Sequence, residues 1–413
     1  MVQTEFVRGT KLKITYNGNE LDVTYISKEE GYLTVKLQNG YNITIPENKI
    51  TVLKSSEPQP VKKKSITLKH GNGIPISLIT TGGTIVSAID YDTGAVHPST
   101  DIRKIIDRYP YMEEKYAISV REFDNILSEN MQPNMWIKLA AVIKEELSKS
   151  KGVLVSHGTD TMSYTASALA FMFEKLTGPV VMVGSQRSSD RPSSDSFGNM
   201  EGAMAFSSTN VGEICVSMHS GTSDDSISLH RGTRTRKMHS TRRDAFRSVS
   251  GTPIAKFRNK NIEFLSEYKE KSDEILLTGK LEEEISMIYF HPGLKGEDIE
   301  KISEGKKAII IMGSGLGHIS QSLFPSVKKV IGTGTKIVMT TQCMSGIVDL
   351  NVYSTGRELK KLGVVSAENM LPEIALTKSM YLLGNYPHED FEEMMKVNMR
   401  GEILEREFLG DCY

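Results

Sequence analysis

The stretch GVLVSHGTDTM, residues 152–162, joins an apolar segment to a dense group of small polar residues. Its first half, with Val153, Leu154 and Val155, has the composition of a buried strand. Its second half places a histidine, a glycine, two threonines and an aspartate directly after that strand. A surface turn needs only one or two such residues. The stretch therefore predicts a buried strand that ends at a functional site.

A second predicted strand ends in the same way. The segment ISLITTGGT, residues 76–84, runs from apolar residues into threonines and glycines. Glycines let backbone N–H groups approach a ligand, and a threonine hydroxyl can act as a nucleophile beside a base and an oxyanion site. Each motif alone has an ordinary explanation, because Gly-Gly commonly forms turns and Thr-Asp commonly caps a helix. Two such motifs in one sheet favour a shared site at the carboxyl ends of the strands.

Strands alternate with helices along most of the chain, which is typical of an α/β fold. The expected strands lie at 76–83, 152–158, 179–185, 285–291, 306–315 and 335–343, and the expected helices at 135–150 and 162–178. We therefore predict two α/β domains, at 75–270 and 271–413, built on parallel sheets. Helices should cover both faces of the first sheet.

The first 56 residues have a different pattern. Short strands alternate with turn residues, and Asn17-Gly18 and Asn39-Gly40 are strong hairpin signals. About five short strands in this length predict a small β-barrel domain of the Tudor or Sm type at 1–56. Residues 57–74 contain two prolines and a lysine triplet, so we expect a linker there.

Composition restricts the function classes. The formal net charge of −1 predicts no general affinity for nucleic acid. No apolar stretch is long enough to span a membrane, and the N-terminal residues lack the pattern of a secretory signal. The cysteines Cys215, Cys343 and Cys412 are far apart, which predicts free thiols in a cytoplasmic protein. The nine histidines show no metal-ligand spacing, so no metal site is expected.

Three segments, TGGTI (81–85), GVLVSHGTDTM (152–162) and PVVMVGSQR (179–187), resemble the signature of the L-asparaginase/glutaminase family. Val86 stands where the family usually has a smaller residue. The resemblance extends over about residues 75–413 and implies the asparaginase-like fold of two α/β domains. It also implies an amidohydrolase that acts on a side-chain amide.

This resemblance implies catalytic roles for four residues. Thr81 matches the nucleophile that attacks the amide carbon, and Thr159 and Asp160 match the second threonine and its partner acid. The segment TRTRKMHSTRRDAF, residues 233–246, resembles the one that carries the activating lysine, which is Lys237 here. Thr159, Lys237 and Asp160 are expected to relay protons, and Asp160 can also hold the substrate amino group.

The same resemblance implies three substrate-binding residues. The segment ILSENM, residues 126–131, resembles the one whose serine contacts the substrate carboxylate, which gives Ser128 and its neighbour Glu129. The family commonly has glutamine at the position of Glu129. Tyr91 matches the tyrosine of a mobile lid. His157 is expected to support its loop through hydrogen bonds.

The charges near Lys237 offer a physical argument for its role. Residues 231–247 contain seven lysines and arginines but only one acid, Asp244. Like charges and burial would disfavour the ammonium form and leave a lysine that can accept a proton. Two other interpretations of the arginines stay open, namely a salt-bridged surface and a phosphate-contacting patch for RNA.

Several further stretches resemble a narrower group, the glutaminase subunits of tRNA-dependent amidotransferases. They are KLQNGYNITIPENKI (36–50), SQRSSDRPSSDSFGN (185–199), KMHSTRRDAFRS (237–248), TTQCMSGIVDLNVYSTGREL (340–359) and NMLPEIALTKSMYLLG (369–384). The resemblance implies that the chain releases ammonia from glutamine for a partner subunit, which amidates glutamate on tRNA(Gln). It places ATP and Mg²⁺ in the partner and no cofactor in this chain. It also implies a self-dimer within a heterotetramer of two copies of each subunit.

Two other functions remain as alternatives. A stand-alone cytosolic L-asparaginase/glutaminase needs only the two α/β domains and has no use for the barrel. A non-catalytic RNA-binding protein is disfavoured because all four matched catalytic residues are present. The glycine-rich segment MGSGLGHIS, residues 312–320, lacks the lysine of a phosphate-binding loop, so we interpret it as a turn of the domain core.

Overall fold

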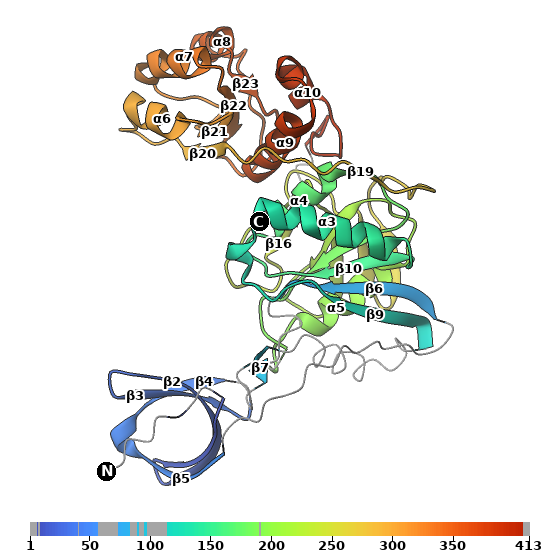
Figure 1. The fold of residues 1–413 in the computed structure, drawn as a ribbon, viewed down its shortest axis with the longest axis vertical. Coiled ribbons are helices and arrows are strands. Elements are labelled where there is room, and N and C mark those ends of the chain that lie inside the picture. Colours follow the sequence, from blue (N-terminus) through green and yellow to red (C-terminus); the bar gives the residue numbers. More distant parts are fainter. Residues whose placement is uncertain are drawn as a thin grey trace.

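The computed structural model describes residues 6, 9–39, 41–56, 73–82, 114–189 and 191–407, with the backbone of the short strands β7 (Ile89–Asp90) and β8 (Ala95–Val96). Tyr91, the expected lid residue, lies outside the described residues. Three folded units follow one another along the chain (Figure 1). Among the described helices, none is long and apolar enough to cross a bilayer.

The N-terminal unit is a curved antiparallel sheet with the strand order β4-β3-β2-β1-β5 (Figure 1). Its strands are β1 (Lys11–Tyr16), β2 (Asn19–Glu29), β3 (Tyr32–Leu37), β4 (Asn42–Pro46) and β5 (Ile50–Ser56), with a 3₁₀ turn at Glu47–Lys49. The first predicted hairpin is confirmed, since Asn17 and Gly18 have positive φ angles of 49° and 79°. Gly40, in the second predicted turn, lies outside the described residues. Ile14 and Val35 are fully buried in a core that belongs to this sheet.

The central unit is built on a mixed sheet with the order β18-β17-β14-β13-β12-β10-β6-β9. Its strands are β6 (Ile74–Thr80), β9 (Tyr116–Glu122), β10 (Gly152–Ser156), β12 (Val180–Val183), β13 (Ile214–His219), β14 (Ser226–Arg231), β17 (Ala255–Arg258) and β18 (Asn261–Phe264). The pairs from β9 to β13 are parallel, as predicted, but β14, β17 and β18 are antiparallel. The prediction of a wholly parallel sheet is wrong at this edge because short turns join β13 to β14 and β17 to β18.

Helices cover both faces of the central sheet, as predicted. The helices α3 (Pro133–Leu147) and α4 (Met162–Met172) share one core with Val153 and Val155. The helix α5 (Ser196–Ser207) shares the other core with Leu154. Alternating side chains of β10 therefore fill opposite faces, which fixes the strand in the middle of the unit.

One predicted helix is too long. The helix expected over 162–178 ends at Met172, and the next residues form β11 (Phe173–Lys175). This strand pairs with β19 (Leu276–Leu277), a distant segment of the chain that local sequence does not reveal. A further hairpin is formed by β15 (Thr235–Lys237) and β16 (Phe246–Ser248).

The C-terminal unit is a parallel sheet in the order β20-β21-β22-β23, and its first three strands confirm those expected at 285–291, 306–315 and 335–343. The strands are β20 (Ile285–Tyr289), β21 (Ala308–Gly313), β22 (Lys336–Thr341) and β23 (Val365–Ser366). The helices are α6 (Gly296–Ser303), α7 (Phe324–Gly332), α8 (Ser354–Leu362), α9 (Pro372–Asn385) and α10 (Phe391–Lys396), with 3₁₀ turns at Gln321–Leu323 and His388–Asp390. Separate apolar cores lie on the two faces of this sheet.

The two α/β units meet where α4 packs against α9 (Figure 1). The hydroxyls of Ser167 and Thr377 are 2.8 Å apart across this contact. The buried guanidinium of Arg234 donates to the carbonyls of Asn369 at 2.7 Å and Glu402 at 3.1 Å. Burial lowers the pKa of Arg234 to about 10, which leaves it a cation at neutral pH. The contact between the units is therefore polar as well as apolar.

Candidate active site

The two strand ends singled out in the sequence are neighbours in the structure. Strands β6 and β10 pair in parallel with Thr80 opposite Ser156, so both polar segments leave the same edge of the sheet. Thr81 is almost fully buried, and its hydroxyl donates to the Ser156 carbonyl at 2.8 Å. Gly82 follows with a φ of +108°. A Cβ on Gly82 would lie 2.5 Å from the Ile126 carbonyl oxygen, so only glycine fits at position 82.

Lys237 reaches the second strand end. Its ammonium donates to the Thr159 hydroxyl at 2.8 Å and to an Asp160 carboxylate oxygen at 2.8 Å. The Lys237 side chain is 13% exposed, whereas that of Asp160 is 68% exposed. The structure therefore brings together the three residues expected to relay protons, and it leaves the carboxylate open to solvent.

Ser128 lies against the same loop. It begins a 3₁₀ turn, Ser128–Asn130, and is buried, while Glu129 beside it is exposed. Thr161 donates through its hydroxyl to the Ser128 carbonyl at 2.6 Å. A Cβ on Gly158 would approach the Ser128 Cβ to 2.7 Å, so glycine permits this close contact. The segment expected to bind substrate thus sits beside the strand end that carries Thr159.

His157 supports the loop, which confirms the prediction made for it. Its Nδ1 lies 2.6 Å from the Gly158 carbonyl and its Nε2 lies 3.0 Å from the Thr165 hydroxyl. Trp136 donates to the same hydroxyl at 3.0 Å. Because Nδ1 faces a carbonyl and must donate, Nε2 of the neutral ring accepts from the Thr165 hydroxyl. Burial lowers the pKa of His157 to about 4, and the neutral ring fits this pattern of one donor and one acceptor. We assign it a structural role, since both ring nitrogens are occupied.

The arginines around Lys237 are all held by partners. Arg231 pairs with Glu213, Arg236 with Glu373, Arg242 and Arg247 with Asp244, and Arg243 with Asp224, while Arg234 binds backbone carbonyls. The salt-bridged interpretation therefore describes five of the six arginines. Their positive charge near Lys237 is offset in part, because four carboxylates pair with these five arginines and Lys237 itself contacts the Asp160 carboxylate.

Sequence reasoning missed the carboxylates that hold this region. Glu213 precedes β13, Asp224 lies in the turn before β14 and Glu373 lies on α9, so only the fold brings them to the arginines. The excess of basic residues at 231–247 indicates that acidic residues from other segments pair with them. Within the described residues, no group of three or more histidine, cysteine, aspartate or glutamate side chains could hold a metal ion.

Comparison with known families matches both α/β units. Residues 75–270 match the N-terminal asparaginase family model, and residues 284–397 match that of the glutaminase/asparaginase C-terminal domain. Among solved structures, a thermostable L-asparaginase from Thermococcus kodakarensis is 29% identical with a TM-score of 0.74. L-asparaginase I from Vibrio cholerae is 30% identical with a TM-score of 0.70. Each alignment covers 80% of this chain and 99% of the asparaginase chain.

Relatives of known name match nearly the whole chain, the N-terminal sheet included. The D-type subunit of the glutamyl-tRNA(Gln) amidotransferase from Thermoplasma volcanium is 48% identical, over 97% of this chain and 99% of its own length. The D-type subunit from Pyrococcus abyssi is 42% identical over 97% of this chain and 94% of its own length. The chain therefore belongs to the asparaginase/glutaminase family of enzymes, in the branch formed by the D-type subunits of glutamyl-tRNA(Gln) amidotransferases.

Proposed function

We propose that the chain is the glutaminase component of a tRNA-dependent amidotransferase and that it supplies ammonia to a partner subunit. The observation that carries this proposal is the position of Lys237, whose ammonium lies 2.8 Å from both the Thr159 hydroxyl and the Asp160 carboxylate. A lysine, a hydroxyl and an acid in contact can move a proton. They do so at the sheet edge from which Thr81 also emerges.

In this proposal Thr81 is the nucleophile. Its oxygen forms a bond to the side-chain carbonyl carbon of glutamine, the carbon–nitrogen bond breaks, and ammonia leaves with the proton that Thr81 gave up. Water then hydrolyses the ester, which releases glutamate and restores the Thr81 hydroxyl. That hydroxyl now rests on the Ser156 carbonyl, and this contact must break before attack. Thr159 and Lys237 carry the proton between the groups.

Substrate binding follows from the charges and exposure of the site. Asp160, with its open carboxylate, holds the α-amino group of glutamine. Ser128 holds the α-carboxylate, and Glu129 lies at the rim. Tyr91 closes over the bound substrate in the same proposal. Asparagine, one methylene shorter, is the alternative substrate.

The names of the relatives support the wider role. We propose that a GatE-type partner binds ATP and Mg²⁺ and uses the ammonia to amidate glutamate carried by tRNA(Gln). Two copies of this chain form a dimer within a heterotetramer in the cytoplasm. The curved N-terminal sheet is proposed to be a Tudor/Sm-like barrel domain at 1–56, joined by the linker 57–74 to the α/β domains 75–270 and 271–413.

A stand-alone asparaginase/glutaminase is the second candidate. The likeness to the Thermococcus asparaginase, with a TM-score of 0.74, favours it. That structure covers 80% of this chain, however, whereas the Thermoplasma volcanium amidotransferase subunit covers 97%. The difference favours the amidotransferase role.

Ammonia release from glutamine separates the two candidates. It is measured for the purified chain alone, with the partner subunit, and with the partner and glutamate-charged tRNA(Gln). Activity that appears only in the last mixture supports the amidotransferase role. Full activity of the chain alone supports the stand-alone enzyme, and no hydrolysis in any mixture contradicts both.

A further inference from the structure

The end of the Lys237 hairpin is tied to a turn of the central sheet. Lys237 is the last residue of β15 and pairs with Phe246 of β16. Between them, residues 238–245 form a loop closed by a hydrogen bond of 2.6 Å from the Met238 amide to the Ala245 carbonyl. The position of the Lys237 ammonium therefore depends on what holds this loop.

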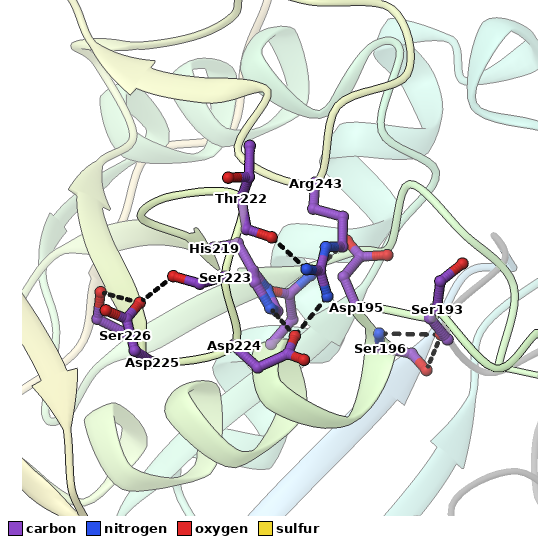
Figure 2. A network of polar contacts seen from close by, with 12 residues as sticks. Ser193, Asp195, Ser196, His219, Thr222, Ser223, Asp224, Asp225, Ser226 and Arg243 are labelled. Atoms are coloured by element: carbon purple, nitrogen blue, oxygen red, sulfur yellow. Dashed lines mark hydrogen bonds and ion pairs between the residues drawn. The ribbon is translucent and has the colours of Figure 1, made fainter.

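Two arginines, one in the loop and one in β16, anchor the hairpin on the turn between β13 and β14. Arg243 contacts the Asp224 carboxylate and the Thr222 carbonyl, as Figure 2 shows. Arg247 donates to the Ser220 carbonyl at 3.0 Å. The Arg243 side chain is 16% exposed, so its guanidinium is held in place where it joins the two segments.

Asp224 is in turn held from the sheet side by a buried histidine. His219 Nε2 lies 3.1 Å from the same Asp224 oxygen that Arg243 contacts (Figure 2). His219 Nδ1 lies 2.6 Å from the side-chain oxygen of Asn199. The His219 side chain is wholly buried, so it acts as a fixed support for the exposed carboxylate.

The same network reaches the back of the proposed active site. The Asn199 amide nitrogen donates to Asp195 at 3.0 Å and to the Gly184 carbonyl at 2.9 Å. Gly184 lies next to Thr159, since a Cβ added to Gly184 would lie 2.9 Å from the Thr159 methyl carbon. The hydrogen-bonded chain from Arg243 to Gly184 thus ends against Thr159, the residue that accepts from Lys237.

We propose that Asp224 is a positioning residue, which clamps Arg243 and the 238–245 loop to the His219–Asn199 network and so holds Lys237 on Thr159. This inference rests on the proposed function, because it assigns Lys237 a part in amide hydrolysis. Asp224 contacts Arg243 and His219. It acts through Arg243, and its exposed side chain can be changed without opening the core.

The kinetic test compares two neighbouring aspartates in the assembled complex with charged tRNA. Asp224→Asn removes the charge that holds Arg243. Asp225→Asn is the matched control, because Asp225 bonds within its own turn, to Ser223 and Ser226, and lies 3.8 Å from Arg258. A displaced proton-relay group costs about tenfold to a hundredfold in rate, so kcat for glutamine should fall by that factor in Asp224→Asn with KM within about twofold. Asp225→Asn should keep the wild-type kcat, and Asp224→Glu should recover most of it.

A double-mutant cycle identifies the partner. If the two residues act as one clamp, Asp224→Asn combined with Arg243→Gln should be no slower than the slower single variant. Additive losses would overturn the proposal, as would an unchanged kcat in Asp224→Asn or an equal loss in Asp225→Asn.

A second measurement does not depend on turnover. Hydrogen exchange of the Met238, Thr241 and Arg242 amides, all hydrogen-bonded within the loop, should be at least about tenfold faster in Asp224→Asn than in the wild type or in Asp225→Asn. Unchanged exchange overturns the clamp. If the wild-type complex releases no ammonia, the proposed function fails, while the exchange result still decides whether Asp224 holds the loop.

Discussion

Lys237 and Thr159 stand 78 positions apart in the chain, yet the lysine ammonium lies 2.8 Å from the threonine hydroxyl. Because Thr159 accepts from Lys237, its own hydrogen is left to point at another atom. In the proposed mechanism, a glutamine bound beside Thr81 supplies that atom, and the contact between Lys237 and Thr159 is the path for protons.

Replacement of Thr81 tests the nucleophile. Thr81→Ala should lower ammonia release from glutamine by about a thousandfold or more, because no covalent ester can form. Amidation driven by added ammonium should continue, because the partner's chemistry does not need Thr81. Thr81→Ser, which keeps a hydroxyl, is the matched variant and should retain part of the rate. Substantial glutaminase activity in Thr81→Ala would assign the nucleophile to another residue.

Replacement of Lys237 tests the proton relay. Lys237→Met keeps the length of the side chain but removes its donors, and it should lower kcat by about a hundredfold to ten-thousandfold. The exposed Lys138 of α3 provides the control, since Lys138→Met should leave kcat within about twofold. Steady-state ammonia release measures both variants. Equal rates for the wild type and Lys237→Met would remove Lys237 from the mechanism.

Acid should destabilise the fold through His157. The pKa of His157 in the folded chain is about 4, below the ordinary value of 6.5. Between these two pH values the unfolded chain therefore binds a proton at His157 and the folded chain does not. The stability contributed by neutral His157 is complete above pH 6.5 and is lost as the pH falls toward 4, by roughly 3 kcal/mol. Unfolding by urea at several pH values should show a shallower loss in His157→Gln than in the wild type. The assignment is contradicted if the free energy of unfolding falls with pH as steeply in His157→Gln as in the exposed-site control His388→Gln.

The buried ion pair of the C-terminal unit should be costly to break on one side. The Lys378 ammonium and the Glu402 carboxylate are 2.7 Å apart, and both side chains are wholly buried. Lys378→Met leaves the carboxylate without a counter-ion and should lower the free energy of unfolding by about 3–5 kcal/mol. The double variant with Glu402→Gln should recover part of this loss. Lys396→Met, in an exposed pair with Glu392, should cost about 1 kcal/mol or less, and a comparable loss there would refute the role of burial.

The strand ends and their neighbours could be predicted because their signals are local. An apolar run followed by small polar residues marks β6 and β10, and parallel pairing alone places Thr81 near the loop that carries Thr159. The assignment of Lys237 came from resemblance, and its contact with Asp160 came from the structure.

The remainder depends on pairings that local sequence does not encode. The antiparallel edge combines short turns, from β13 to β14 and from β17 to β18, with a pairing of β14 and β17 across the β15–β16 hairpin. Strand β11 forms only because β19 is there to pair with it. The acids that pair with the arginines, among them Asp224 and Glu373, lie on other segments of the chain. A charge count over residues 231–247 alone therefore leaves these carboxylates out.

The anchorage of Arg234 has a consequence for the timing of synthesis. Arg234 stands three positions before Lys237, and its guanidinium is held by the carbonyls of Asn369 and Glu402, which the ribosome adds 135 and 168 residues later. A nascent chain that stops short of them, or one truncated by a protease, lacks the groups that seat the strand leading to Lys237. Chains that end before Glu402 should therefore show little or no enzyme activity.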